Sequence, residues 1–259
     1  MTGTILDKIV SDKAKRVKSA KALTTIDELL AVAETIRSDR KAFCFREAIS
    51  QIDSVNVIAE FKRASPSKGI INGDADAAKI AKEYETRGAA AISVLTEEDH
   101  FKGSDDDLKA VRSAVSLPIL RKDFVIDEFQ IYEAAALGAD AVLLIVAALD
   151  AEKLFAFRHL ANSLGLDALV EVHDADELNI AKDIGADIIG VNNRNLKTFE
   201  VSIDVSRYLI LNKPQNAVMI TESGISTFDE IQELRSLGFS AFLIGETLMR
   251  GGLNLLNGK

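Results

Sequence analysis

The fold is decided by a short junction, Leu137-Gly138-Ala139-Asp140-Ala141, that recurs along the chain. Similar junctions begin at Arg87, Ile184 and Leu237, and each has a glycine followed by small or polar residues and then an apolar run. A glycine at this point can adopt the left-handed conformation that ends a helix. Each junction therefore predicts the end of one helix and the start of the next strand.

Apolar runs of strand length alternate with amphipathic stretches on both sides of this junction. Most runs are uninterrupted and rich in Val, Ile, Leu and Ala, which is typical of parallel strands covered on both faces. We expect strands at 55–61, 89–95, 117–122, 140–146, 167–172, 187–192, 217–222 and 240–244. We expect helices at 75–87, 105–115, 127–137, 150–164, 175–184, 203–211, 227–237 and 246–256.

This alternation of eight strands with eight helices favours an α/β fold, a (β/α)8 TIM barrel, over an open doubly wound sheet. The Gly-x-Gly-x-x-Gly loop of the open fold is absent from the sequence. Residues able to cap the helices are Asp74, Ser104, Asp127, Asp150, Asp174 and Ser226. We expect residues 1–259 to form a single domain.

The first part of the chain lies outside the repeat. Its apolar residues gather on helical faces, the first of which comprises Ile5, Leu6, Ile9 and Val10. We expect residues 1–50 to be an N-terminal helical extension packed on the barrel. Asp7 and Asp12 interrupt the basic face that a targeting peptide would need.

Composition narrows the classes of function. The chain has 259 residues and a net charge of −9, so a nucleic-acid partner has no electrostatic support. The single cysteine, Cys44, excludes a disulfide framework. The longest apolar run, Ala141–Leu149, is too short to span a bilayer. We therefore expect a cytoplasmic protein without a membrane or nucleic-acid partner, in which local cations and backbone amides hold any anionic substrate.

Charged side chains stand where the apolar runs end. They are Glu60, Lys62, Lys122, Glu171 and Arg194, accompanied by Asn192. A buried charge is costly unless it is paired, and residues two apart on a strand share a face. Because the carboxyl ends of barrel strands form one mouth, where barrel enzymes have their active sites, we expect these side chains to converge there. A structural ion-pair network without a reactive role is the alternative.

Glycines follow the last two strands, in Ser223-Gly224-Ile225 and Gly245-Glu246. Exposed backbone amides at these strand ends and at a helix start predict a phosphate site, with simple turn glycines as the alternative. Ser65 and Lys68 in the loop after the first strand could also donate to an anion, or form a solvated surface loop. The histidines, His100, His159 and His173, are too few and too scattered for a zinc set.

These residues lie in a series of motifs that resembles the indole-3-glycerol-phosphate synthase family of tryptophan biosynthesis. In chain order the motifs are Ile58–Gly69, Ser93–Glu97, Leu120–Phe124, Leu169–His173, Gly190–Leu196, Glu222–Ile225 and Leu243–Glu246. Thr221 stands where a serine is common. The resemblance implies ring closure of 1-(2-carboxyphenylamino)-1-deoxyribulose 5-phosphate, with loss of carbon dioxide and water, to indole-3-glycerol phosphate. It also implies that no cofactor or metal is needed.

The resemblance assigns roles to the charged residues. Lys122 would be the general acid that protonates the ketone oxygen, with a pKa depressed by burial or nearby cations. Glu171 would be the general base that accepts the ring proton or assists dehydration. Glu60 and Lys62 would hold the substrate, and Lys62 is also a candidate acid in the dehydration. How the two lysines divide the proton transfers stays open.

The remaining candidates bind or orient the substrate. Asn192 and Ser223 would orient its hydroxyls and the catalytic carboxylates, while Arg194 and Ser65 would meet the anthranilate carboxylate. The expected phosphate contacts come from Gly224, Gly245, Glu246 and Lys62. The other expected substrate contacts are Phe124, Leu143, Leu196 and Glu222, and core packing is the alternative for each apolar one.

Two other functions fit the pattern less well. A Schiff-base barrel aldolase would use Lys122 or Lys62 as a nucleophile. A catalytically silent barrel that binds a phosphometabolite is the second alternative, although the intact charged set argues against it. Oligomeric state, docking to other tryptophan-pathway enzymes, the rate-limiting step and the thermal optimum stay open.

Overall fold

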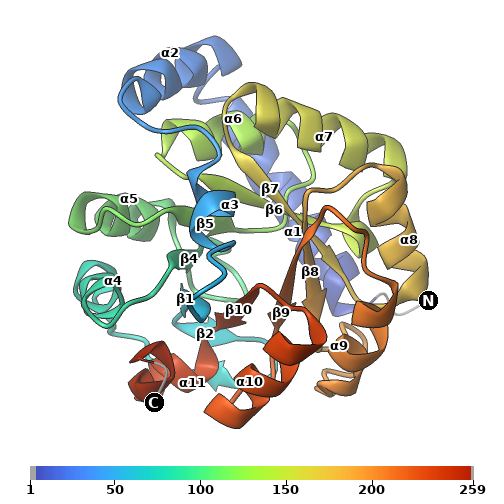
Figure 1. Ribbon diagram of the computed structural model, residues 1–259. Coiled ribbons are helices and arrows are strands. Elements are labelled where there is room, and N and C mark those ends of the chain that lie inside the picture. Colours follow the sequence, from blue (N-terminus) through green and yellow to red (C-terminus); the bar gives the residue numbers. More distant parts are fainter. Residues whose placement is uncertain (1–3, 258–259) are drawn as a thin grey trace.

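The computed structural model describes residues 4–257, and its centre is a closed barrel (Figure 1). Eight parallel strands follow one another around it in the order β1-β10-β9-β8-β7-β6-β5-β4. They are β1 (Asn56–Phe61), β4 (Ala91–Leu95), β5 (Ile119–Lys122), β6 (Ala141–Ile145), β7 (Asp167–Val172), β8 (Ile188–Asn192), β9 (Val218–Glu222) and β10 (Ala241–Ile244). Helices alternate with these strands, so the expected (β/α)8 TIM barrel is confirmed.

The helices form an outer ring around the strands (Figure 1). They are α4 (Ala77–Thr86), α5 (Asp105–Ala114), α6 (Phe129–Ala136), α7 (Ala151–Ser163), α8 (Ala175–Asp183), α9 (Asp204–Leu209), α10 (Phe228–Leu237) and α11 (Glu246–Met249). A hairpin of β2 (Ala64–Ser65) and β3 (Gly69–Ile70) follows β1. Short 3-10 turns are η1 (Val146–Ala148), η2 (Ile210–Asn212) and η3 (Leu253–Asn257). None of the helices within residues 4–257 is long and apolar enough to cross a membrane.

The last helix differs from the expected 246–256. It ends at Met249, because Gly251 adopts a positive φ of 96° and the chain continues into a 3-10 turn. Two of the expected caps are also wrong, since Asp76 and Thr227 hold the positions expected for Asp74 and Ser226. At α6 the expected Asp127 does cap the helix, because its carboxylate accepts from the amide of Phe129 at 2.9 Å. At α10 the reason is reciprocal bonding: the Thr227 side chain accepts from the amide of Glu230, whose carboxylate reaches back.

Side-chain alternation divides the apolar residues between two cores. Val57, Ala59 and Phe61 point outward and pack with the helices, whereas Ile58 points inward with apolar residues of the other strands. The inner core is closed at both ends by the N-terminal extension, through Ile9 at one end and Phe45 at the other. The barrel is therefore a packed interior, and the site can lie only beyond the strand ends.

The N-terminal extension consists of α1 (Ile5–Lys21), α2 (Ile26–Arg37) and α3 (Cys44–Ala48), which confirms the expected helical extension for the residues described. Helices α1 and α3 lie at opposite ends of the barrel, with α3 nearer the viewer in Figure 1. Helix α2 packs against α6. The assignment of residues 1–259 to a single domain stays a prediction.

Asp140, in the junction before β6, ties this extension to the amino-terminal end of the barrel. Its side chain is fully buried and accepts two hydrogen bonds of 2.9 and 2.7 Å at Oδ1 from Arg40. Arg112 and the backbone amide of Ile119 donate to Oδ2 at 3.1 and 2.9 Å. The polar residue of the junction is therefore kept as a buried carboxylate that joins the extension to the barrel.

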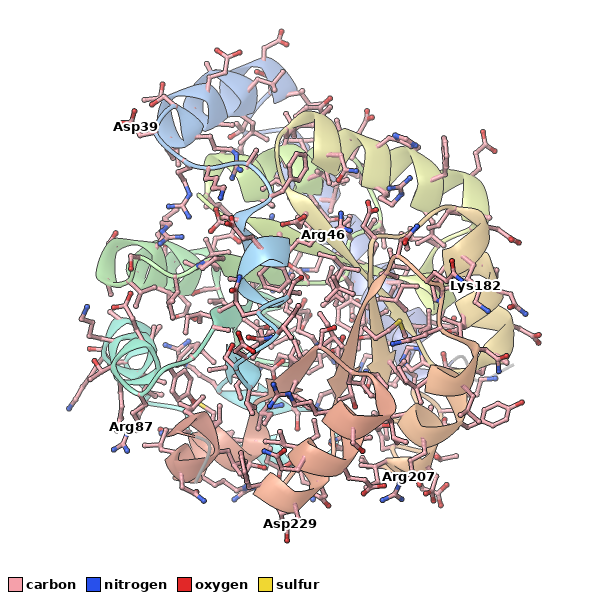
Figure 2. The ribbon with its side chains drawn as sticks, in the orientation of Figure 1. Asp39, Arg46, Arg87, Lys182, Arg207 and Asp229 are labelled. Atoms are coloured by element: carbon pink, nitrogen blue, oxygen red, sulfur yellow. The ribbon has the colours of Figure 1, made fainter. Side chains whose placement is uncertain are left out.

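Asp140→Ala should lower the free energy of unfolding by about 3–5 kcal/mol, because it leaves buried guanidinium groups without their counter-ion. Urea denaturation followed by circular dichroism measures the change. Asp39→Ala is the matched control, since Asp39 is exposed just beyond α2 (Figure 2). Equal losses in the two variants would contradict the anchoring role of Asp140.

Candidate active site

A cavity of about 920 Å³ opens at the carboxyl ends of the barrel strands. Every residue that the sequence proposed for the site lines it: Glu60, Lys62, Ser65, Lys122, Phe124, Leu143, Glu171, Asn192, Arg194, Leu196, Glu222, Ser223, Gly224, Gly245 and Glu246. These residues come from strands and loops along most of the barrel sequence. The structure thus brings the expected set together, while their individual roles stay predictions.

Lys122 is at the centre of the charged part of the cavity. Its Nζ atom lies 3.7 Å from Glu60 Oε2, 3.8 Å from Glu171 Oε2 and 3.5 Å from Glu222 Oε2. The side chains of these carboxylates are at most 3% exposed, and that of Lys122 is 16% exposed. Each partner belongs to a different strand, so the cluster exists only because the barrel is closed.

The expected depression of the Lys122 pKa is wrong. Burial favours the neutral amine, but the charges of Glu222, Glu60 and Glu171 outweigh it and raise the pKa above the ordinary lysine value. Sequence position could place Lys122 at the mouth but could not show that three carboxylates surround it. The surrounding carboxylates therefore favour the charged ammonium form of Lys122 over the neutral amine.

The pKa values of Glu171 and Glu222 shift in opposite directions. Burial raises the pKa of Glu222, and the neighbouring Glu171 charge raises it further. Burial also acts on Glu171, but His173 and Lys122 outweigh it and lower the pKa. The Glu60 pKa is lowered too, because Lys62 and Lys122 overcome the effect of burial. The site therefore combines ionised carboxylates with one that retains its proton more readily.

Glycines make room for these carboxylates. A Cβ atom on Gly190 would lie 2.2 Å from Glu222 Oε1, and one on Gly245 would lie 2.2 Å from Glu60 Oε1. Such approaches are closer than real Cβ contacts, so any other residue at either position would force the neighbouring glutamate side chain to shift. Gly190 lies inside a β-strand, where glycine often marks close approach of another group.

The strand ends proposed for phosphate lie in the same cavity. Ser223 and Gly224 both have positive φ, of 66° and 81°, so the chain turns sharply after β9. The Glu246 carboxylate lies 3.2 Å from Nε of Arg250, another residue that lines the cavity. That contact engages the Glu246 carboxylate with a cation, which reduces its repulsion of an anion at the neighbouring amides.

Asn193 is a supporting residue that sequence reasoning missed. Its side-chain Nδ2 donates to Thr221 Oγ1 and to the carbonyl of Ser223, both at 3.0 Å. Its Oδ1 accepts from the amide of Ser206 at 3.1 Å. Asn193, Ser206 and Thr221 are almost completely buried, so the network holds the strained Ser223 turn from behind. The sequence signal for this residue was the pair Asn192-Asn193 at the end of β8, of which only the first was considered.

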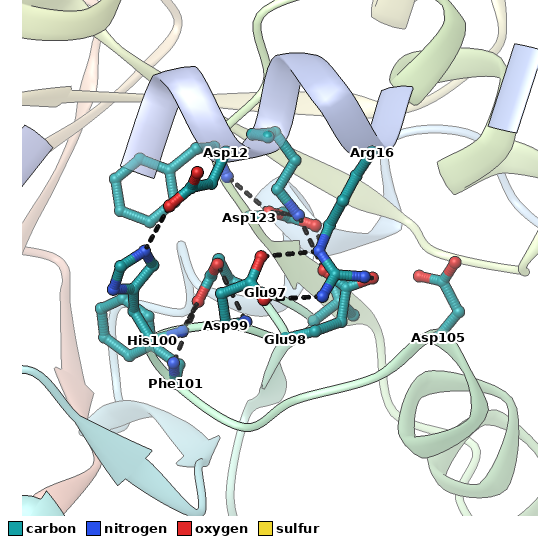
Figure 3. A network of polar contacts seen from close by, with 12 residues as sticks. Asp12, Arg16, Glu97, Glu98, Asp99, His100, Phe101, Asp105 and Asp123 are labelled. Carbon is teal, nitrogen blue, oxygen red and sulfur yellow. Dashed lines mark hydrogen bonds and ion pairs between the residues drawn. The ribbon is translucent and has the colours of Figure 1, made fainter. Parts of the chain in front are cut away.

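Helix α1 covers the opposite wall through Ile5, Leu6 and Ile9. It is held by a network of ion pairs with the loops after β4 and β5 (Figure 3). Lys13 Nζ lies 2.7 Å from Oδ1 of Asp123, the residue after Lys122. Lys13 is 5% exposed and continues the apolar stripe of its helix, which was a signal that sequence reasoning overlooked.

Glu97 holds the loop that completes this wall. Its carboxylate accepts from the backbone amides of Asp99, His100 and Phe101 at 3.1, 2.7 and 2.9 Å (Figure 3). Phe101 and Phe124 then meet with ring centroids 6.1 Å apart and give the cavity an aromatic wall. The apolar wall expected from Phe124 is thus extended by Phe101.

Fold and site together define a class: a (β/α)8-barrel enzyme whose cavity at the carboxyl ends of the strands is lined by lysines, buried carboxylates and turn glycines. Among residues 4–257 no group of three or more His, Cys, Asp or Glu side chains is arranged to hold a metal ion.

Comparison with known proteins specifies the family. A family model described as indole-3-glycerol phosphate synthase matches residues 6–254. The chain is 49% identical over 246 residues to an indole-3-glycerol phosphate synthase of Thermoanaerobacter pseudethanolicus, covering 95% of this chain and 92% of the relative. It is 48% identical to the one of Chloroherpeton thalassium, with 95% of each chain covered. The chain belongs to the indole-3-glycerol phosphate synthase family.

Solved structures with low identity share the barrel. The N-acetylmannosamine-6-phosphate 2-epimerase of Clostridium perfringens has a TM-score of 0.59 at 16% identity, covering 78% of this chain and 91% of that one. The thiamine phosphate pyrophosphorylase of Pyrococcus furiosus has a TM-score of 0.57 at 16% identity, covering 79% and 92%. At this identity the likeness concerns the fold alone.

Gly190→Ala should lower the free energy of unfolding by about 1–3 kcal/mol, because the new methyl group overlaps the buried Glu222 side chain. Urea denaturation measures this loss. Gly73→Ala is the control, since Gly73 is exposed and the nearest atom to its added Cβ is 3.4 Å away. A Gly190→Ala protein as stable as the control would show that Glu222 has room to move.

Proposed function

We propose that this cavity converts 1-(2-carboxyphenylamino)-1-deoxyribulose 5-phosphate to indole-3-glycerol phosphate by general acid–base catalysis. The activity follows from the family: the chain is a carboxy-lyase of tryptophan biosynthesis. The observation that carries the proposed mechanism is the Lys122 ammonium, held among carboxylates beside the Gly224 and Gly245 strand ends.

Lys122 acts in the ring closure. The ring carbon that bears the carboxylate attacks the ketone carbon, which forms the new carbon–carbon bond and moves negative charge onto the ketone oxygen. Lys122 donates its proton to that oxygen. Its raised pKa keeps the ammonium charged in the free enzyme, and the developing alkoxide is a stronger base than the amine.

Glu171 acts after the ring has closed. Carbon dioxide leaves, and the electrons of the broken bond restore the aromatic ring, so no ring proton has to be removed at this carbon. Dehydration then expels the former ketone oxygen as water, with an acid at that oxygen and a base for the proton that the substrate loses. We assign the base to Glu171, which is ionised, and the acid to Lys62, 2.6 Å from Glu60 Oε1.

Arg194 and Ser65 bind the anthranilate carboxylate in this proposal. Nη1 of Arg194 donates to Ser67 Oγ at 3.1 Å and to the Phe199 carbonyl at 3.3 Å, which orients the guanidinium at the cavity wall. A guanidinium presents several N–H groups in a planar fork, so Arg194 can donate to both oxygens of a carboxylate without losing these contacts.

The substrate phosphate is assigned to the backbone amides of Gly224, Gly245 and Glu246, with Lys62 nearby. The amides and the aromatic wall of Phe101 and Phe124 line the same cavity from different elements, the amides after β9 and β10 and the rings after β4 and β5. A bifunctional substrate with a phosphate at one end and an aromatic ring at the other suits such a division. Asn192 and Ser223 orient the hydroxyls between them.

A Schiff-base mechanism is less compatible with the site. Imine formation needs a neutral amine, whereas the carboxylates around Lys122 stabilise its charged form. Borohydride treatment in the presence of substrate separates the two mechanisms, since only an aldolase-type intermediate leaves a stable covalent adduct.

Cytoplasmic location is part of the proposal. A chain with one free cysteine suits a reducing compartment. Its negative net charge gives no support to nucleic-acid binding.

Lys122→Ala should reduce turnover of the aminodeoxyribulose phosphate by roughly 10²–10⁴-fold, because loss of a general acid removes about that factor. Formation of the indole product is followed by its fluorescence. Lys153→Ala is the control, because Lys153 is exposed on α7. Unchanged turnover in a folded Lys122→Ala protein would end the proposed role, and a wild-type enzyme that forms no indole would end the proposed function.

A further inference from the structure

His173 lies behind Glu171, outside the residues that line the cavity. Its Nε2 atom is 3.3 Å from Glu171 Oε1, and its Nδ1 atom is 3.0 Å from Glu177 Oε2. The side chains are 12%, 3% and 18% exposed for His173, Glu171 and Glu177. A largely buried imidazole thus bridges a site carboxylate and a carboxylate of α8.

Helix α8 holds the imidazole in this place. Glu177, in its first turn, accepts from both the backbone amide and the ring of His173, at 2.8 and 3.0 Å. The Glu177 amide in turn donates to the capping carboxylate of Asp174 at 2.9 Å. The bond between Nδ1 and Glu177 directs the opposite ring nitrogen, Nε2, toward Glu171.

The site is short of positive charge without His173. The charged groups that face Glu171 are Lys122 on β5, Glu222 on β9, Glu60 on β1 and His173 beyond the end of its own strand. Lys62 is engaged with Glu60 at 2.6 Å, so without His173 the Lys122 ammonium would have to serve both Glu171 and Glu222. His173 is the further cation that meets Glu171, and it contacts neither Glu60 nor Glu222 in the part of the chain described.

We propose that His173 is a positioning residue: its imidazolium selects Glu171 as the ionised base and leaves the proton of the cluster on Glu222. The inference rests on the proposed function, since it concerns the base of that reaction. Glu171 and Glu222 share the Lys122 ammonium at similar distances, so that contact alone does not distinguish them. The contact with His173 distinguishes them, because His173 meets Glu171 and not Glu222 in the part of the chain described.

The ionisation of the three groups agrees with this arrangement. Burial opposes a charge on His173, but Glu171 and Glu177 raise its pKa to about 10, so it is protonated at neutral pH. The Glu171 pKa is lowered and the Glu222 pKa is raised. Both oxygens of Glu222, Oε2 of Glu171 and Nε2 of His173 make no hydrogen bond among the residues described, so His173 acts on Glu171 through charge across 3.3 Å.

The sign of the pH effect follows from the charge. Glu171 works as a base only when ionised, and a neutral side chain at position 173 would raise its pKa. In His173→Gln the acidic limb of kcat/KM should therefore move up by about one pH unit or more, with a loss of about tenfold or more at acidic pH that recovers as pH rises. His173→Lys, which restores a cation, should retain a limb close to that of wild type.

A structural role alone would produce a different result. If His173→Gln and His173→Lys lost activity equally at every pH, with the limb unmoved, His173 would only support the fold and the proposal would be overturned. His159→Gln is the matched control, because His159 lies against Phe155 on the outer helix α7 and its loss should leave the profile unchanged.

Nuclear magnetic resonance of the histidine rings tests the pair without turnover. The chain has three histidines, so His100→Gln and His159→Gln assign the His173 signals. The His173 ring should remain protonated at pH values about two units above the ordinary histidine pKa, and Glu171→Gln should lower its pKa. Titration of His173 near about 6.5, unchanged by Glu171→Gln, would overturn the proposal. A wild type that forms no indole would instead overturn the proposed function.

Discussion

The structure of the site depends on one interaction, the sharing of the buried Lys122 ammonium by Glu60, Glu171 and Glu222. Burying the ammonium or an ionised carboxylate alone is costly, and the attraction between Lys122 and the carboxylates offsets that cost. The partners come from β1, β7 and β9, and β1, the first strand, pairs with the last strand, β10, to close the barrel. This cluster of charges therefore forms only when the sheet has closed into a barrel.

The surrounding shell makes this cluster asymmetric. Gly190 and Gly245 leave room for two of the carboxylates, and Asn193 holds the turn after β9. On the other wall the Lys13–Asp123 ion pair joins helix α1 to the residue that follows Lys122. A site with similar charged groups thereby acquires distinct environments, which acid–base chemistry in several steps requires.

Much of the fold and of the site could be predicted, because the strands and helices of a barrel have regular sequence periods. Apolar runs located the strands, and the two-residue period placed Glu60 and Lys62 on one face. The pKa of Lys122 was predicted in the wrong direction, because a linear sequence does not say which charges meet. The caps expected at Asp74 and Ser226 were displaced by one or two residues, since several nearby side chains can serve and the bonding geometry selects one.

The sequence by itself determined the order of strands and helices, the glycine junctions between them, and the family to which the chain belongs. Only the tertiary structure decided that Lys122 faces three carboxylates, that His173 lies behind Glu171, and that Lys13 reaches Asp123. The physical reason is that local periodicity sets the direction in which a side chain points. The neighbours it meets depend on strand register and barrel closure, which join residues far apart in the chain.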